Sequence, residues 1–173
     1  QFGQLGVNLL SQFSVSEINC RTEEVFYGFV KHWQDPLVTT LDPLLKSFQA
    51  GIDVGDLEYA GYSATIYCHN LFFVGQSLDH VTQEQEKYIN VMRKNKQEFL
   101  IHHTSIIRQL GLQFQGKSEA KYQLIGESFE EVTMMPELIE KKTVMSIFSV
   151  YNCKAILCYF LKDFQQALSN ARS

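Results

Sequence analysis

His80, His102 and His103 come nearest, by type and by neighbouring residues, to a phosphotransfer or metal site. In the phosphoacceptor helix of a histidine kinase, an acidic residue directly follows the histidine and a proline comes soon afterwards. His80 instead lies between Asp79 and Val81, with no proline nearby. Because histidine takes many other roles in proteins, the pattern indicates a histidine near the start of a helix and no phosphoacceptor.

Glu98 and His102 are four residues apart and share one face of a predicted helix, next to His103. A di-iron helical bundle needs Glu and His three residues apart on each of two helices, together with further inward-facing carboxylates. A zinc site needs three or four ligands. Neither pattern is present, so we expect one buried, hydrogen-bonded histidine, one solvated histidine and no metal.

Motifs for nucleotide binding and for nucleophilic catalysis are missing. Gly3 and Gly6 lack the lysine and the preceding strand of a phosphate-binding loop, and the Gly-x-Ser-x-Gly elbow of serine hydrolases does not occur. We therefore predict no catalytic residue, no cofactor and no enzymatic activity in this segment. A small-molecule pocket among the tyrosines and His69 is the enzymatic alternative, and it would require polar groups with shifted pKa values around one cavity.

Four tyrosines on predicted helices are candidate interaction residues. Helical repeats bind peptides on concave faces, and aromatic rings on such a face would line the groove. The alternative places the rings in the core with their hydroxyl groups at the edge of the packing. The four residues are Tyr27, Tyr59, Tyr62 and Tyr67.

The composition is that of an ordinary globular protein. The 173 residues are 45% hydrophobic and 20% charged, with a net charge of -4 and no stripe of basic residues, so nucleic acid is not expected as a partner. No apolar run approaches the ~20 residues that span a bilayer, so we predict no membrane insertion and a soluble, cytoplasmic protein. Four cysteines without a paired short spacing favour buried, reduced thiols.

Apolar residues recur at helical spacing along nearly the whole chain. This periodicity predicts an all-α fold, either a TPR-like helical array or an irregular bundle of antiparallel helix pairs. We expect a single helical domain over residues 1–173, with a mobile loop at 116–123, where residues are small, charged and aperiodic. The start at Gln-Phe-Gly and an end within a predicted helix favour a fragment of a longer chain.

Residues 54–64 and 161–171 repeat one pattern, in which an aspartate precedes a bulky residue and alanines follow one and two turns later. The aspartates should cap helices, and the alanines should allow close helix packing; a ligand cradle is the alternative for the small residues. Gly51 is expected to end the preceding helix, and 143–161 to form a buried helix that includes Phe148 and Tyr159. The predicted packing and turn residues are Trp33, Pro36, Gly55, Asp56, Tyr59, Ala60, Ala64, Gly75, Asp163 and Ala167.

Four short segments, at residues 33–37 (WQDPL), 55–62 (GDLEYAGY), 72–75 (FFVG) and 124–129 (LIGESF), resemble the long helical region of large multidomain signalling kinases. These proteins join a serine/threonine kinase-like domain, an ATPase module, the helical region, a GAF domain and a sensor histidine kinase. The resemblance covers the chain from about Glu23 onward. It implies a TPR-like segment and supplies no catalytic or binding residue.

The resemblance implies a non-catalytic scaffold in signal transduction of the two-component type. Such a module would couple the ATPase module to the sensor and histidine kinase modules, and its partners would be flanking domains or other signalling proteins. The alternative is a stand-alone adaptor that binds a peptide or a partner helix in trans. An exposed, contiguous aromatic patch would favour that adaptor.

Overall fold

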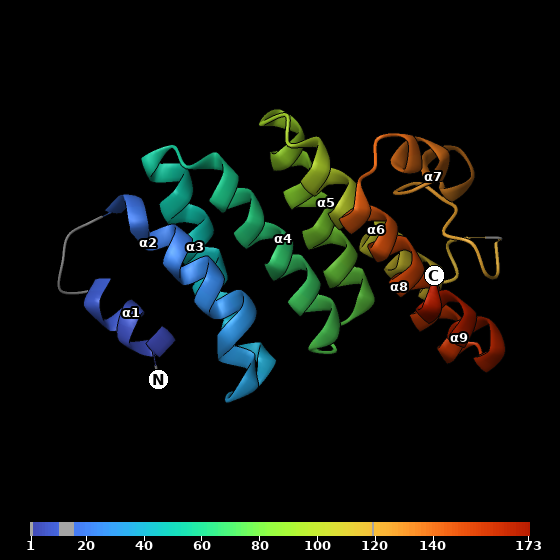
Figure 1. Ribbon diagram of the computed structural model, residues 1–173, viewed down its shortest axis with the longest axis horizontal. Coiled ribbons are helices and arrows are strands. Elements are labelled where there is room, and N and C mark those ends of the chain that lie inside the picture. The colour runs from blue at the N-terminus through green and yellow to red at the C-terminus, as the bar shows by residue number, and fades with distance from the viewer. Residues whose placement is uncertain (1, 11–15, 119) are drawn as a thin grey trace. The chain divides into compact units, whose positions relative to one another are not determined.

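A computed structural model describes residues 2–10, 16–118 and 120–173, and these residues form helices and no named strand (Figure 1). The predicted all-α class is therefore confirmed. The TPR-like arrangement is not confirmed and stays a prediction.

Contacts divide the chain into two compact units, Gln1–Gln76 with Asn90–Leu100 and Ser77–Ile89 with Ile101–Ser173. The single domain expected over residues 1–173 stays a prediction. Unit 1 contains α1 (Phe2–Leu10), α2 (Ser16–Val25), the π-helical turn η1 (Phe26–Val30), the 3₁₀ turns η2 (Lys31–Trp33) and η3 (Leu37–Thr40), α3 (Leu41–Val54) and α4 (Leu57–Phe73). Both units include parts of α5 (Leu78–Lys94) and α6 (Glu98–Phe114), and unit 2 also contains α7 (Glu131–Glu140), α8 (Val144–Phe160) and α9 (Phe164–Arg172).

Small residues hold α3 and α4 together as a pair of neighbouring helices (Figure 1). A Cβ atom added to Gly51 would lie 2.9 Å from the Cβ of Ala60 and 3.1 Å from the Ala60 backbone nitrogen. Nearby, the hydroxyl oxygens of Ser47 and Ser63 are 2.9 Å apart and share a hydrogen bond. The small residues of α4 thus allow a close helix contact.

Gly51 does not end the third helix, and this expectation was wrong. The helix continues to Val54 and ends at Gly55, which has the left-handed φ of 80°. Gly51 lies inside the helix because its missing side chain is what lets α3 approach Ala60. α4 is likewise followed by a glycine in the left-handed conformation, Gly75, whose φ is 79°.

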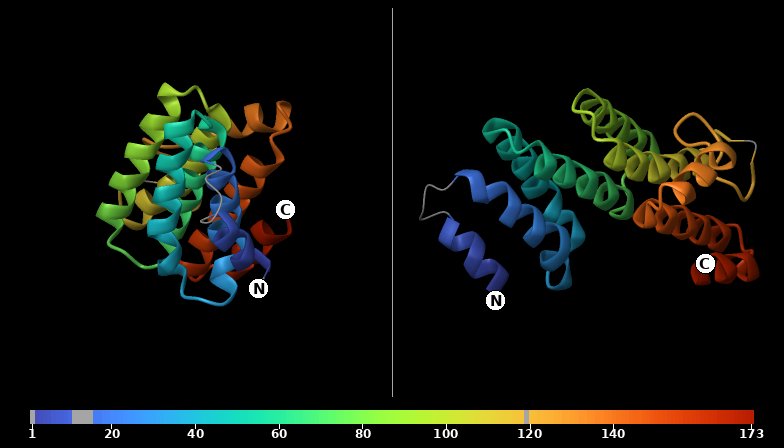
Figure 2. Two further views of the ribbon diagram at one scale, coloured as in Figure 1. Left: turned by 90° about the vertical axis from the view of Figure 1, so that its left-hand side faces the viewer. Right: turned by 45° about the horizontal axis from the view of Figure 1, so that its top comes forward.

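Aspartates begin both helices of the repeated pattern. The Asp56 side chain accepts a hydrogen bond from Tyr59 N at 3.4 Å, and α4 starts directly after it. Asp163 accepts from Gln166 N at 3.1 Å at the start of α9. Ala167, one turn into α9, is buried, and α8 and α9 lie side by side, as the right view of Figure 2 shows.

In unit 2 the buried side chain of Gln109 in α6 organises the segment that leads to α7. Its Nε2 donates to Ile125 O at 3.0 Å, and its Oε1 accepts from Ser128 N at 3.1 Å. Gly126 allows this approach, because a Cβ there would lie 2.5 Å from Gln109 Nε2. The mobility predicted for residues 116–123 stays a prediction, and residue 119 lies outside the described residues.

All four cysteines are buried, as predicted, and none of them forms a disulfide bond. Burial raises the pKa of the Cys153 thiol to about 12, so this thiol is protonated and unreactive in the folded chain. Among the described residues, no helix combines the length and the apolar character that crossing a membrane requires.

Replacing Gly51 by alanine tests the contact between α3 and α4. Alanine favours a helix over glycine by up to ~1 kcal/mol, but the new methyl would meet the backbone of Ala60. We expect Gly51→Ala to lower the free energy of unfolding by about 1–3 kcal/mol, the usual cost of overpacking, measured by urea unfolding followed by circular dichroism.

The double variant Gly51→Ala/Ala60→Gly is the control. Removing the Ala60 methyl relieves the closest contact, so the two substitutions together should destabilise less than the sum of the single effects. Strict additivity, or a Gly51→Ala chain more stable than the parent, would contradict the close contact.

Candidate functional site

Arg21 of α2 and Asp56 at the start of α4 form the centre of a charged and aromatic cluster in unit 1. Arg21 Nε donates to Asp56 Oδ2 at 2.6 Å, and the guanidinium carbon lies 4.8 Å from the centre of the Tyr59 ring. The Tyr62 ring packs edge-on against Tyr59 with centres 5.6 Å apart. Because Asp56 also caps α4, the cluster fixes the start of α4 against α2.

The four predicted interaction tyrosines have different surroundings. Tyr59 and Tyr62 lie together and are partly exposed, whereas Tyr67 is buried in the core. Tyr27, in η1, packs edge-on against Phe26 with ring centres 5.0 Å apart. Burial, and then the hydrogen bond to Glu58, raise the pKa of Tyr62, so its hydroxyl is protonated at neutral pH.

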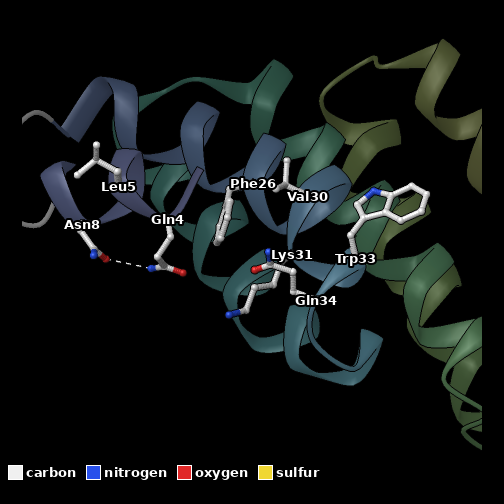
Figure 3. Close-up of a pocket in the computed structure, with 8 residues that line it drawn as sticks. All are labelled: Gln4, Leu5, Asn8, Phe26, Val30, Lys31, Trp33 and Gln34. Atoms are coloured by element: carbon white, nitrogen blue, oxygen red, sulfur yellow. Dashed lines mark hydrogen bonds between the residues drawn. The ribbon is translucent and has the colours of Figure 1, made fainter. Parts of the chain in front are cut away.

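A cavity of about 510 Å³ lies between α1 and the segment η1–η2 (Figure 3). Its size suits a small ligand, but none of the tyrosines named above and not His69 lines it, and Lys31 at its edge is paired with Asp35 at 3.0 Å. The enzymatic alternative, a small-molecule site among the tyrosines and His69, therefore gains no support from this cavity. The lining residues are Gln4, Leu5, Asn8, Phe26, Val30, Lys31, Trp33 and Gln34.

Two predicted packing residues are exposed, and one of them, Trp33, lines this cavity. Trp33 is 80% exposed, and its indole Nε1 donates to Phe29 O at 3.0 Å. Pro36 is also exposed, and its carbonyl accepts from Thr39 N at 2.9 Å and from Thr39 Oγ1 at 2.8 Å. Pro36 thus begins the 3₁₀ turn η3, and Trp33 supplies an exposed aromatic side chain to unit 1.

Glu24 is a buried carboxyl group two residues before the π-helical turn, with only 4% of its surface exposed. Among the described residues, no hydrogen bond or ion pair holds it, and burial raises its pKa to about 7. Gly28 follows in η1, where a Cβ would lie 2.8 Å from Ile66 Cδ1 of α4. π-Helical turns are frequent at functional sites, and here the turn places a carboxyl that titrates near neutral pH in the packing of α2 and η1.

The histidines form no site for metal binding or nucleophilic catalysis in the described part of the chain. His103 Nδ1 lies 2.8 Å from Ser149 Oγ, and the same hydroxyl donates to Met145 O at 2.8 Å. A hydroxyl that donates to a carbonyl accepts from the imidazole and is not activated by it. His80 is exposed, and no three His, Cys, Asp or Glu side chains of the described residues are placed to hold a metal ion.

Four aromatic rings form a contiguous group in unit 2, which we call the aromatic cluster: Phe114, Tyr159, Phe160 and Phe164. The Tyr159 ring centre lies 6.0 Å from that of Phe160 and 5.6 Å from that of Phe164, and Phe114 packs against Phe160 at 5.3 Å. Tyr159, Phe160 and Phe164 are 61%, 66% and 59% exposed.

The expectation that Phe148 and Tyr159 lie on a buried helix was wrong, because both are exposed. A signal for this exposure was present in the sequence. Tyr159, Phe160 and Leu161 are consecutive, and three consecutive residues of a helix cannot all face one core. At least one large apolar side chain at this end of α8 had to be exposed.

Comparison with known proteins adds no assignment to this geometry. No protein-family model, curated protein or solved structure matches the chain. The functional argument therefore depends on the residues and their contacts.

The raised pKa of Glu24 predicts a pH-dependent stability. A carboxyl whose pKa is higher in the folded than in the unfolded chain stabilises the fold while it is protonated. The parent chain should therefore lose roughly 2–3 kcal/mol of this contribution as the pH rises from about 4.5 to 7. Glu24→Gln, which carries no charge, should be more stable than the parent at pH 8 in urea unfolding.

Asp53→Asn, which changes an exposed carboxylate on α3, is the matched control and should keep the pH dependence of the parent. Burial also raises the pKa of Glu23, so a smaller slope of the same sign should remain in Glu24→Gln. Equal slopes in Glu24→Gln and the parent would show that Glu24 does not titrate in this range.

Proposed function

We propose that the chain is a non-catalytic helical interaction module that acts within a large signalling kinase. In this proposal it couples an ATPase module to the sensor and histidine kinase modules. The observation that carries the interaction role is the exposed part of the aromatic cluster, Tyr159, Phe160 and Phe164 on α8 and α9. Contiguous exposed apolar surface marks interaction sites, and large aromatic side chains supply much of the binding energy at protein interfaces.

One of the helices that carry the cluster, α8, is bonded to the start of α7. Lys154 Nζ on α8 lies 2.5 Å from Glu131 Oε1, and both side chains are largely buried. Glu131 Oε2 also accepts from Leu124 N at 2.8 Å. A rigid support lowers the entropy lost when a partner binds. The aromatic rings are therefore already in place before a partner binds.

The role inside a kinase is supported by the resemblance of residues 33–37, 55–62, 72–75 and 124–129 to the helical region of those proteins. Coupling requires that the module contacts a neighbouring domain differently in two states of that domain. The ATPase module is the domain whose state changes with its nucleotide, so it is the partner that the proposal names.

A stand-alone adaptor is the second candidate function. The aromatic cluster favours it as well, because the exposed rings need only a complementary partner and no covalently linked domain. In that case a peptide or helix from another protein would bind in trans, and its affinity would not depend on a nucleotide bound to a neighbouring ATPase.

Binding to the adjacent ATPase module, loaded in turn with ATP and with ADP, tests the proposal. We expect the purified chain to bind one nucleotide state more tightly, by about tenfold or more, since coupling free energies are typically 1–3 kcal/mol. Phe160→Ala should weaken the tighter complex by roughly 30-fold, the effect of losing an aromatic hot spot of about 2 kcal/mol. The measurement is biolayer interferometry or calorimetry.

Phe73→Ala is the matched control, because Phe73 is another exposed aromatic side chain, on α4, and its loss should leave the affinity unchanged. Absence of binding in both nucleotide states would overturn the relay between modules and leave the adaptor. Binding that is equally weakened by Phe73→Ala and Phe160→Ala would remove the aromatic cluster as the site.

A further inference from the structure

α4 and α9 begin in the same way, and this likeness allows one helix to be compared with the other position by position. Asp56 and Asp163 cap the two helices. Four residues later, Ala60 and Ala167 are both buried, and each helix packs on the one that precedes it, α3 or α8. The two helices therefore have corresponding faces.

On α4, the face next to this contact is covered by the residues around the start of α6. A Cβ at Gly61 would lie 2.5 Å from Leu100 Cδ1, and Gln97 Nε2 donates to the carbonyl of Leu57 at 2.6 Å. Both contacts lie within unit 1. The residues at the start of α6 thus cover Gly61 and the backbone of Leu57, whose side chain remains 41% exposed.

On α9, the corresponding face is uncovered. Phe164 stands at the position of Leu57 and Leu168 at that of Gly61, and the two side chains are 59% and 51% exposed. Phe164 also belongs to the aromatic cluster through its contact with Tyr159. Because Leu168 replaces a glycine, a covering helix has to lie farther from α9 and meets an apolar side chain there.

The charges of the residues near this face indicate which kind of partner could cover it. Lys162 precedes α9 and Arg172 ends it, and both are exposed, whereas the first turn of α6 carries Glu98 beside Gln97. An acidic residue in the first turn of a helix is favoured by the helix dipole, and its charge is opposite to those of Lys162 and Arg172. The partner that fits is a helix with an acidic first turn and a leucine shortly after it.

We propose that the α9 face of Phe164 and Leu168 binds the first turn of an amphipathic helix from a protein partner, as α4 binds the start of α6. The inference rests on the proposed function, because it names the chemistry of the partner at the same aromatic surface. A second copy of this chain is a different occupant, and the experiment separates the two.

The probe is a fluorescent peptide with the sequence of residues 95–114 (NKQEFLIHHTSIIRQLGLQF), titrated with the whole chain and followed by fluorescence anisotropy. We expect saturable binding that weakens as salt is added, since exposed charges are screened. Leu168→Asp in the chain should weaken binding at least tenfold. A peptide with alanine in place of Leu100 should lose affinity to a similar extent.

Val132→Asp is the matched control, because Val132 is another exposed apolar residue of unit 2, on α7, and this variant should bind as the parent does. Phe164→Ser is a second variant of the face, for use if Leu168→Asp loses its helical circular dichroism. Peptide binding that persists in both face variants would overturn the proposal, as would the absence of any binding.

Sedimentation of the chain alone identifies the other occupant. A dimer that dissociates in Leu168→Asp would show that a second copy covers the face, and the proposal of a partner helix would be wrong. This experiment can fail independently of the test of the function. Nucleotide-dependent capture of the ATPase module without peptide binding would support the proposed function and overturn the partner helix on α9. Peptide binding without capture would support the partner helix and overturn the coupling to the ATPase module.

Discussion

The close contact between Gly51 and Ala60 is the constraint on which the arrangement of unit 1 depends. Because α3 and α4 contact each other through backbone atoms and a single methyl group, neither helix can easily slide along the other. Ser47 and Ser63 are therefore held opposite each other and form a buried hydrogen bond. Ser47 also donates to the carbonyl of Cys20 on α2 at 2.8 Å. One hydroxyl therefore joins α2, α3 and α4, and the contact of Arg21 with the α4 cap follows from that junction.

The α3–α4 pair and the α8–α9 pair differ in how much of their apolar surface is covered by other helices. This difference suggests which helix is available to bind a partner. α4 has neighbours on several faces, so its small residues contact other helices. α9 buries only Ala167 and Asn170, and the latter donates to Cys158 Sγ at 3.6 Å. A helix with one packed face and one apolar exposed face is stable in its pair yet still has apolar area to bury, which is the physical basis of an interaction surface.

Local patterns in the sequence predict most of the helices and their caps. Asp56 and Asp163 begin helices because a carboxylate satisfies free backbone N–H groups wherever a turn precedes an apolar periodic run. The π-helical turn at Phe26–Val30 and the burial of Glu24 were not predicted, since both depend on tertiary packing, such as that of the turn's Gly28 against Ile66 of α4. The exposure of Tyr159 was not predicted for a related reason: periodicity shows that a helix has apolar faces but not which of them a neighbour covers.

The turn between α8 and α9 shows how the backbone positions the aromatic cluster. Lys162 has a left-handed φ of 65°, a conformation that costs a non-glycine residue about 1–2 kcal/mol. Two hydrogen bonds offset this strain, from Lys162 N to Tyr159 O at 3.0 Å and from Asp163 N to Cys158 O at 2.9 Å. A lysine also brings a cation to the negative end of the α8 dipole, which a glycine cannot do. The same residue therefore ends α8, places Asp163 to cap α9 and sets Tyr159 and Phe164 side by side at the surface.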